Sequence, residues 1–518
     1  MKRVFLRKNS YYDSVFLMKI TAELKSCEGI DEVQVTMATK QNLDLLSDLG
    51  FEDYSGEASP QDLLIAISGD ESLFEELQRK VDSLLSASSS QGIEDTHRPS
   101  SLDGALNVLP SANLALISLP GDYAVLEAYR ALRSGLHCML FSDNVSLEDE
   151  RDLKRFALER GLLLMGPDCG TAIINGNPLC FANEVSSGPI GIVAASGTGA
   201  QEVSVLIDRL GSGCSQVIGT GGRDLKEEVG GITMQKGISA LAQDHRTEVI
   251  VVISKPPAES VAQEILQSLS RIDKPSIVHF LSSPKLQSLE GIEFASTLEE
   301  TALLALSHLE GMELLELKSK VQSEESSFDL MREVETKGPE QRYLRAYFSG
   351  GTLCDESLCI LSEEISDLYS NIEHEGVLVL DDPMKSSANT LLDLGDDFFT
   401  RGRPHPMIDP NTRIDRMSDE VVNDGEIAVV MFDLVLGFGC HHDPAEPLLP
   451  LIEAAQTKAR SRGNELTFIA SIVGVEKDPQ SYSRQRTQLE ELGVIVTPSN
   501  ARMAHLAKEV MKKIGQKR

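Results

Sequence analysis

One local pattern occurs twice in this chain, and it restricts the possible folds more than any other feature. A strand-like apolar stretch runs into a Ser-Gly loop, and a helix-like segment follows. The first copy is Gly191-Ile192-Val193-Ala194-Ala195-Ser196-Gly197-Thr198-Gly199, and the second is Leu344-Arg345-Ala346-Tyr347-Phe348-Ser349-Gly350-Gly351-Thr352. A helix that begins at the end of a strand presents open backbone N–H groups and the positive end of its dipole there. Each copy therefore predicts an anion site, usually for phosphate, and two copies suggest helix ends that face one phosphoryl group.

Strand-like and helix-like segments alternate along most of the chain, which is typical of parallel sheets with right-handed crossovers. One set of predicted strands covers 190–195, 216–219, 248–254, 276–280 and 292–295. A second set covers 344–348, 390–394, 427–432, 467–471 and 494–496. Because the sets agree in order and in loop chemistry, we expect a duplicated five-strand, flavodoxin-like domain with an insertion around 371–387 in the second copy. The alternative is a shared strand rhythm without duplication.

Charge and apolar content exclude several classes of partner. The 518 residues carry a formal net charge of −32, so we expect neither nucleic acid nor an anionic membrane as a partner. No apolar run reaches the length of about 20 residues that a spanning helix needs, and residues 1–14 lack the apolar core of a signal peptide. The eight cysteines are scattered, which favours reduced thiols and a cytoplasmic location.

Three runs resemble motifs of the succinyl-CoA synthetase superfamily, in the same order and at similar spacing. They are Gly166-Pro167-Asp168-Cys169-Gly170-Thr171-Ala172-Ile173-Ile174, Gly191-Ile192-Val193-Ala194-Ala195-Ser196-Gly197-Thr198 and Gln216-Val217-Ile218-Gly219-Thr220-Gly221-Gly222-Arg223-Asp224. The whole chain resembles the FdrA family, in its YahF-like branch. The signatures of that branch lie at 142–150, 166–176, 254–259 and 394–410.

The resemblance implies a phosphate site between two helix N-termini, which in the synthetases come from two subunits and stabilise a phosphorylated histidine. This chain departs from the family pattern at the histidine motif, because the connection 281–290 contains no histidine. The supporting glutamate loop is replaced by Ser254-Lys255-Pro256-Pro257. No ATP-grasp domain is evident, and the N-terminal half of the CoA-binding domain is missing. The phosphate-holding scaffold is therefore expected to remain without the covalent relay.

Some members of the FdrA family are associated with oxamate carbamoyltransferase, alongside separate subunits. The resemblance thus implies a subunit of a carbamoyl- or acyl-group transferase that stabilises a phosphate or an acyl phosphate between two helix N-termini. The first alternative is an NDP-forming acyl-CoA ligase subunit, and the second is a non-catalytic ligand-binding or scaffold protein. The expected ligands are phosphate or an acyl or carbamoyl phosphate, with CoA as a further candidate. We also expect a separate partner subunit and an oligomer.

The expected α/β architecture has five parts. Residues 1–90 form a small N-terminal α/β domain, and 105–186 a partial CoA-binding-like Rossmann domain. Residues 187–312 form a first succinyl-CoA-synthetase-like flavodoxin domain. A polar linker at 313–340 precedes a second flavodoxin-like ligase domain at 341–518.

The loop Thr400-Arg401-Gly402-Arg403-Pro404-His405-Pro406 supplies the catalytic candidates. Arg401 and Arg403 suit a carboxylate or a phosphate, and His405 can act as a general acid or base near neutral pH. The prolines restrict the backbone that carries these side chains. The alternatives are a surface loop paired with Asp396-Asp397 and a structural histidine.

Further substrate-binding candidates follow two other predicted strands. They are Arg223, Asp224, Gly437 and Gly439, because ligands of open α/β sheets bind at the carboxyl ends of strands. The alternative for Arg223 and Asp224 is an internal ion pair.

The remaining polar candidates favour structural roles. Asp393, Asp396 and Asp397 could bind Mg²⁺, and Cys440-His441-His442-Asp443 has residue types that bind zinc, but we predict no metal at either place. Acidic residues early in the two repeated helices, namely Glu202, Asp355 and Glu356, are better explained by the helix dipole. Cys169 and Cys354 are expected to be packing residues.

Overall fold

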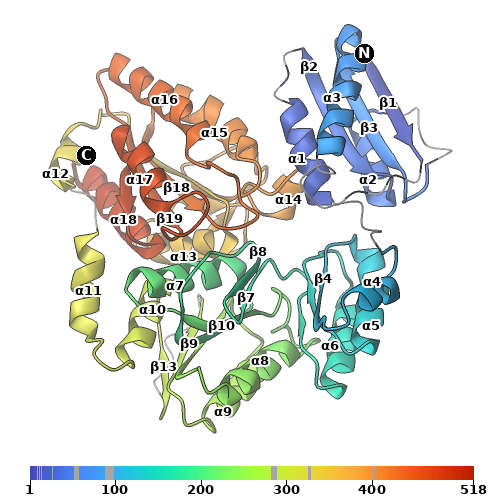
Figure 1. Cartoon of the computed structure of the whole chain (residues 1–518). Coiled ribbons are helices and arrows are strands. Elements are labelled where there is room, and N and C mark those ends of the chain that lie inside the picture. Colours follow the sequence, from blue (N-terminus) through green and yellow to red (C-terminus); the bar gives the residue numbers. More distant parts are fainter. Residues whose placement is uncertain are drawn as a thin grey trace. The chain divides into compact units, whose positions relative to one another are not determined.

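A computed structural model describes residues 1–8, 10, 12, 14–25, 27, 29–51, 58–87, 99–281, 289–324, 328–401 and 403–517. The chain divides into two units. Unit 1 comprises Met1–Asn113 together with Thr400–Asp409, and unit 2 comprises Leu114–Phe399 together with Pro410–Arg518. Figure 1 labels the elements of both. The chain therefore leaves the second unit once, at Thr400, and returns to it at Pro410.

Unit 1 contains a three-stranded antiparallel sheet of order β1-β3-β2. Its elements are β1 (Lys2–Arg7), α1 (Ser14–Lys25), β2 (Ile30–Met37), α2 (Lys40–Asp48), β3 (Leu63–Gly69), α3 (Phe74–Ala87) and α4 (Leu102–Val108). The central strand β3 is apolar and wholly buried, as expected for a strand that pairs on both sides. The Ser-rich composition of residues 86–92 indicates a linker, and this segment lies mostly outside the described residues.

Unit 2 begins with a small parallel sheet of order β4-β5-β6. Its elements are β4 (Leu114–Ile117), α5 (Gly121–Arg133), β5 (His137–Leu140), α6 (Leu147–Glu159) and β6 (Leu164–Met165). Helix α6 begins at the N-cap Ser146, whose hydroxyl accepts from the Asp149 N–H. This cap satisfies one of the open donors of the first turn.

The first large sheet has the order β13-β12-β11-β9-β10-β7-β8. Its elements are β7 (Thr171–Ile174), β8 (Asn177–Cys180), β9 (Ser187–Ala194), α7 (Gly197–Arg209), β10 (Cys214–Gly219), α8 (Ile232–Gln243), β11 (Val249–Ser254), α9 (Glu259–Leu269), β12 (Ser276–Phe280), β13 (Ile292–Phe294) and α10 (Leu298–Ser307). Strands β9 to β13 pair in parallel. The hairpin β7-β8 adds an antiparallel edge.

The second large sheet has the order β16-β15-β17-β14-β18-β19-β20, and its pairs are parallel. Its elements are β14 (Tyr343–Phe348), α13 (Gly351–Ser362), β15 (Leu368–Ser370), β16 (Leu378–Val379), β17 (Asn389–Asp393), α14 (Asp397–Thr400), α15 (Asn411–Asn423), β18 (Ile427–Val435), α16 (Leu449–Ser461), β19 (Thr467–Val473), α17 (Tyr482–Glu491), β20 (Ile495–Thr497) and α18 (Asn500–Lys517).

The strand orders match the predicted duplication. In the first sheet β9 lies between β10 and β11, and β12 and β13 follow on the β11 side. In the second sheet β14 lies between β17 and β18, and β19 and β20 follow on the β18 side. Both cores therefore have the strand order 2-1-3-4-5, which is the flavodoxin-like arrangement. The predicted insertion at about 371–387 contains β16, and β15 directly precedes it; both strands extend one edge of the second sheet.

The predicted linker at 313–340 contains two helices among its described residues. Helices α11 (Leu314–Ser323) and α12 (Leu330–Glu335) cover much of it. Leu317, Val321 and Val334 are buried in spite of the polar sequence around them. A polar helix with a narrow apolar stripe has the same composition as an irregular linker. Only the spacing of the few apolar residues distinguishes the helix from the linker.

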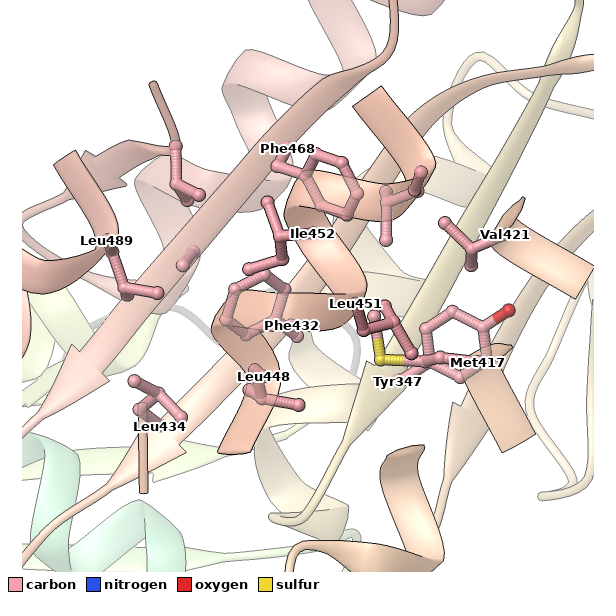
Figure 2. Packing of buried hydrophobic residues seen from close by; sticks show 14 of the residues in the cluster. Tyr347, Met417, Val421, Phe432, Leu434, Leu448, Leu451, Ile452, Phe468 and Leu489 are labelled. Carbon is pink, nitrogen blue, oxygen red and sulfur yellow. The ribbon is translucent and has the colours of Figure 1, made fainter. Parts of the chain in front are cut away.

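The core of the second large sheet is built from apolar residues of its strands and covering helices. Figure 2 shows Phe432, Ile452 and Phe468 near one another, and Tyr347 beside Met417 in the same cluster. All nine residues of β18 are buried, as in a central parallel strand covered on both faces. Asp433 is the charged residue within this strand, and it ends the apolar run from which the sequence predicted the strand.

Candidate functional site

The two repeated Ser-Gly loops meet within unit 2. Helices α7 and α13 lie side by side (Figure 1) and are in contact. The Ser196 hydroxyl caps α7 by accepting from the Gly199 N–H at 2.9 Å, and it lies 2.6 Å from the Thr352 hydroxyl of α13. The repeated motif therefore places two helix N-termini at one point, as the sequence suggested.

This close approach explains one glycine of the second loop. A Cβ atom on Gly350 would lie 2.9 Å from the methyl group of Thr198. That separation is shorter than a carbon–carbon contact of about 3.5–4.0 Å, so a larger residue at Gly350 would push the two helix ends apart.

A carboxylate already occupies the loop that precedes α13. Asp433 accepts hydrogen bonds from Ser349 N–H, from the Ser349 hydroxyl and from Gly350 N–H, at distances of 2.8 to 3.0 Å. The guanidinium of Arg413 also donates to the Asp433 carboxylate and to its backbone oxygen. Both side chains are buried. The expectation that the N–H groups of this loop are open to a ligand is therefore wrong for Ser349 and Gly350.

The loop that precedes α7 has no such carboxylate at the corresponding position. In the duplicated sheets Ser254 of β11 takes the place that Asp433 takes in β18, and its hydroxyl donates to the Lys255 carbonyl at 2.6 Å. Gly197, the first residue of α7, is exposed. Apart from the Gly199 N–H, which donates to the Ser196 hydroxyl, the first-turn N–H groups of α7 are thus the better anion donors of the two sets.

A second acidic side chain lies beside α13. A Cβ atom on Gly351 would be 2.5 Å from Oδ2 of Asp393, and Oδ1 of Asp393 accepts from the Gly395 N–H at 2.9 Å. Burial raises the pKa of Asp393 to about 7, and the positive charge of Lys255 opposes this rise. The end of α13 is thus acidic, whereas Lys255 supplies a cation that is exposed to solvent.

Two buried glutamates join the repeats behind the helix ends. Glu202 of α7 accepts from the Asn500 N–H at the start of α18, at 2.9 Å. Glu356 of α13 accepts from the Leu298 N–H at the start of α10, at 2.7 Å, and from the Asn500 side chain. Each repeat therefore caps a helix of the other, which supports the structural role predicted for these acids. Burial raises the pKa of Glu202 to about 8 and that of Glu356 to about 7.

Arg223 and Asp224 are engaged internally, but not with each other. Arg223 pairs with Glu150 at 2.9 Å. Asp224 pairs with the buried Lys154 at 2.7 Å and accepts from two N–H groups at the start of α8. Their predicted role in substrate binding therefore gains no geometric support.

Gly437 and Gly439 have a packing explanation. Both adopt positive φ, of 111° and 79°. A Cβ atom on Gly437 would lie 2.6 Å from the Ala182 oxygen, and one on Gly439 would lie 2.9 Å from the Phe181 ring. Close contact with another chain segment thus accounts for these glycines without a ligand.

The predicted catalytic loop belongs to unit 1. Arg401, Arg403 and His405 fall within Thr400–Asp409, so the structure does not bring them together with α7 and α13 in one unit. Nδ1 of His405 accepts from the Met407 N–H at 3.3 Å, an arrangement that fits the structural alternative. Their catalytic role stays a prediction.

Neither candidate metal cluster is assembled. Asp396 accepts from the Phe398 N–H, and Asp443 binds Arg484 and Gln485. Among the described residues no group of three or more His, Cys, Asp and Glu side chains could hold a metal ion. In the same part of the chain, no helix combines the length and the apolar character that crossing a bilayer requires.

Sequence reasoning missed the role of Asp433 and Arg413. The available signal was a charged residue directly after the apolar run Ile427–Phe432, because a charge in a buried strand needs a partner. The identity of that partner, 20 residues away in α15, could not be read from local patterns.

Three family models match parts of the chain. A model described as "AllF, heavy metal-associated domain" matches residues 1–99, one described as "CoA binding domain" matches residues 185–280, and one described as "CoA-ligase" matches residues 347–510. The described residues within 1–99, which the first of these models matches, do not fit a metal site. Cys27 is the one cysteine in residues 1–99, and its thiol contacts the Lys80 ammonium at 3.6 Å.

Relatives match the chain over its full length and over parts of it. It is 42% identical over 510 residues to the uncharacterized protein YahF from Escherichia coli (strain K12), covering 98% of both chains. It is 28% identical over 172 residues to the succinate–CoA ligase [ADP-forming] subunit alpha from Aquifex aeolicus (strain VF5), covering 32% of this chain and 54% of that one. The solved structure of PH0766 from Pyrococcus horikoshii OT3 is 13% identical and covers 82% of this chain and 88% of its own, with a TM-score of 0.33, too low to support a structural argument.

These matches separate the functional alternatives. The CoA-binding and CoA-ligase models favour the acyl-CoA ligase alternative. They give no support to carbamoyl transfer, which was the first interpretation of the sequence.

Proposed function

Since this chain belongs to the FdrA family, in its YahF-like branch within the succinyl-CoA synthetase superfamily, we propose that it performs the acyl-transfer half of an acyl-CoA ligase reaction. Its substrates would be an acyl phosphate and CoA. The CoA-binding and CoA-ligase models support CoA as the acceptor. A separate subunit would form the acyl phosphate.

The contact between Ser196 and Thr352 carries this proposal, because it places two helix N-termini at one point. The first-turn N–H groups of α7 would bind the phosphoryl group, and Lys255 would add a positive charge. The CoA sulfur would attack the acyl carbon, forming the C–S bond. The C–O bond to phosphate would break, and phosphate would leave with the electron pair and take up the proton that the CoA thiol loses. Donors at α7 would stabilise the charge that develops on it.

Replacing Gly197 tests the phosphate site directly. We expect Gly197→Asp to weaken the binding of inorganic phosphate and of acetyl phosphate at least tenfold in titration calorimetry, because the new carboxylate would occupy the same N–H groups. A Cβ atom at Gly197 would lie 3.2 Å from the Thr171 hydroxyl, so this hydroxyl must shift by a few tenths of an ångström to admit the new side chain. An acid in the first turn should also leave helix stability equal or slightly higher.

Gly197→Asn is the matched control, with the same size and no charge, and should retain phosphate binding within a few fold. Acyl transfer is then measured as thioester formation from acetyl phosphate and CoA, using protein purified with any subunit that remains bound. Equal phosphate affinity in the Asp and Asn variants would show that α7 is not the site. Transfer from carbamoyl phosphate but not from acetyl phosphate would restore the first interpretation.

A second candidate function is ligand binding without turnover. The observation that favours it is Asp433, which fills the N–H groups of the loop before α13 and so removes half of the two-helix site. Tight phosphate binding with no thioester formation, in the complex as isolated, would favour this candidate.

A further inference from the structure

A thiol, an imidazole and a carboxylate meet on the outer part of α13, away from its N-terminus. Cys359 and Asp355 lie four residues apart and so share one face of the helix. His374 follows β15 in the inserted segment, and its Nε2 lies 3.2 Å from the Cys359 sulfur and 3.6 Å from Oδ1 of Asp355. The His374 and Asp355 side chains are buried, and Cys359 is half-buried.

The contacts of the ring fix where its protons lie. Nδ1 of His374 is 2.8 Å from the Glu375 carbonyl oxygen, and since a carbonyl only accepts, Nδ1 carries a proton. A neutral ring would then turn the lone pair of Nε2 toward the Asp355 carboxylate. Transfer of the thiol proton to Nε2 removes this repulsion, and the resulting imidazolium attracts both the thiolate and the carboxylate.

Five of the other thiols lie in surroundings that disfavour the thiolate form. Burial raises the pKa of Cys138, Cys169 and Cys214 to about 12 and that of Cys180 to about 11. It also raises the pKa of Cys354 well above its ordinary value. These five thiols therefore stay protonated and unreactive. Cys180 is itself half-buried, so three of the four half-buried thiols remain as candidates, namely Cys27, Cys359 and Cys440.

We propose that Cys359 is a peroxide-reactive thiol activated by His374 and Asp355. The inference is independent of the proposed acyl transfer. The Cys359 thiolate attacks one oxygen of a hydroperoxide, so an S–O bond forms and the O–O bond breaks. The sulfur is oxidised by two electrons to a sulfenic acid and the peroxide is reduced. His374 gives its Nε2 proton to the leaving oxygen, which departs as water from hydrogen peroxide.

The geometry favours this chemistry over a hydrolytic triad. In a triad the carboxylate binds the ring nitrogen opposite the nucleophile, where it orients the base. Here Asp355 and Cys359 share Nε2, and the backbone holds Nδ1. Asp355 therefore acts on the charge of the ring rather than on its orientation.

The test treats the full chain with hydrogen peroxide, traps sulfenic acid with dimedone, and measures each cysteine by mass spectrometry. We expect Cys359 to be trapped at least ten times faster than Cys27 or Cys440. His374→Gln should slow the trapping of Cys359 at least tenfold and leave the rates at the other two cysteines unchanged. Asp355→Asn should slow it by a smaller factor.

The comparison among cysteines of the unaltered chain needs no variant, so a folding defect cannot obscure it. Faster trapping at Cys27 or Cys440 than at Cys359 would overturn the proposal. It would also fail if His374→Gln, shown to be folded by its thermal unfolding curve, kept the rate of the unaltered chain.

Discussion

At the scale of single residues, Asp433 makes the two repeated loops chemically different. It is buried within the apolar strand β18, and it satisfies two backbone N–H groups of the loop before α13. Arg413 balances its charge. The corresponding residue of the first repeat is Ser254, so a carboxylate fills the backbone motif in one repeat and is missing from this position in the other.

We expect Asp433→Ala to lower the free energy of unfolding by about 3–5 kcal/mol, because it leaves the Arg413 guanidinium buried without a counter-charge and two N–H groups without an acceptor. Urea denaturation would measure the loss. Asp433→Asn keeps an acceptor oxygen of similar shape and should lose less. A loss below about 1 kcal/mol in the Ala variant would mean that water replaces the carboxylate.

At the scale of elements, four helices hold the two repeats together. Helix α7 contacts α10 and α13, and α13 contacts α18. Glu202 caps α18 and Glu356 caps α10, each across the repeat boundary. Because each capping acid comes from the opposite repeat, neither helix end is satisfied when the repeats separate. The positions of the two N-termini are thus set by packing on both sides.

The buried acids predict how stability depends on pH. Glu202 has a pKa of about 8 in the folded chain and an ordinary value of 4.5, so between these values the folded state holds a proton that the unfolded state has lost. Stability therefore falls as pH rises through this window, by about 1.4 kcal/mol per pH unit for one carboxyl. In the Glu202→Gln variant, the free energy of unfolding should fall less steeply with pH, by about 1.4 kcal/mol per pH unit. Urea denaturation at several pH values from 5 to 8 measures this slope.

Glu264→Gln is a suitable control, because Glu264 lies on α9 and is exposed. Its slope of stability against pH should equal that of the unaltered chain. An equal slope in Glu202→Gln as well would show that Glu202 is already ionised in the folded chain.

At the scale of the whole molecule, the net charge of −32 opposes any anionic substrate. The proposed site at α7 must therefore bind phosphate through short-range donors, since the long-range field repels it. On a basic nucleotide-binding surface, by contrast, the long-range field would attract the anion.

Salt should accordingly strengthen phosphate binding or leave it unchanged. Raising the ionic strength from about 0.01 M to about 0.1 M shortens the Debye length from about 30 Å to about 10 Å. We expect the affinity for inorganic phosphate to rise by a factor of about 2, measured by titration calorimetry with a weakly coordinating salt. A fall of tenfold or more would show that distant cations, rather than the N–H groups of α7, supply the attraction.

Sequence patterns correctly predicted the alternation of strands and helices, the duplication and the meeting of the two Ser-Gly loops. Strand periodicity, apolar runs and glycine positions are local properties, and each can be recognised within a short stretch of the sequence. The helices of the segment 313–340 were not predicted, because they carry few apolar residues within a polar sequence. The grouping of Thr400–Asp409 with unit 1 had no local signal at all.

Tertiary structure alone decided which groups the site contains. Asp433 meets Ser349 across 84 residues, and Glu202 meets Asn500 across 298 residues. Such contacts depend on the register of β18 against β14 and on the packing of helices from both repeats. Local sequence patterns do not predict these contacts. A charged residue in a buried strand indicates that it needs a partner, but not which residue that partner is. The fold, by bringing distant strands together, determines which residue becomes that partner.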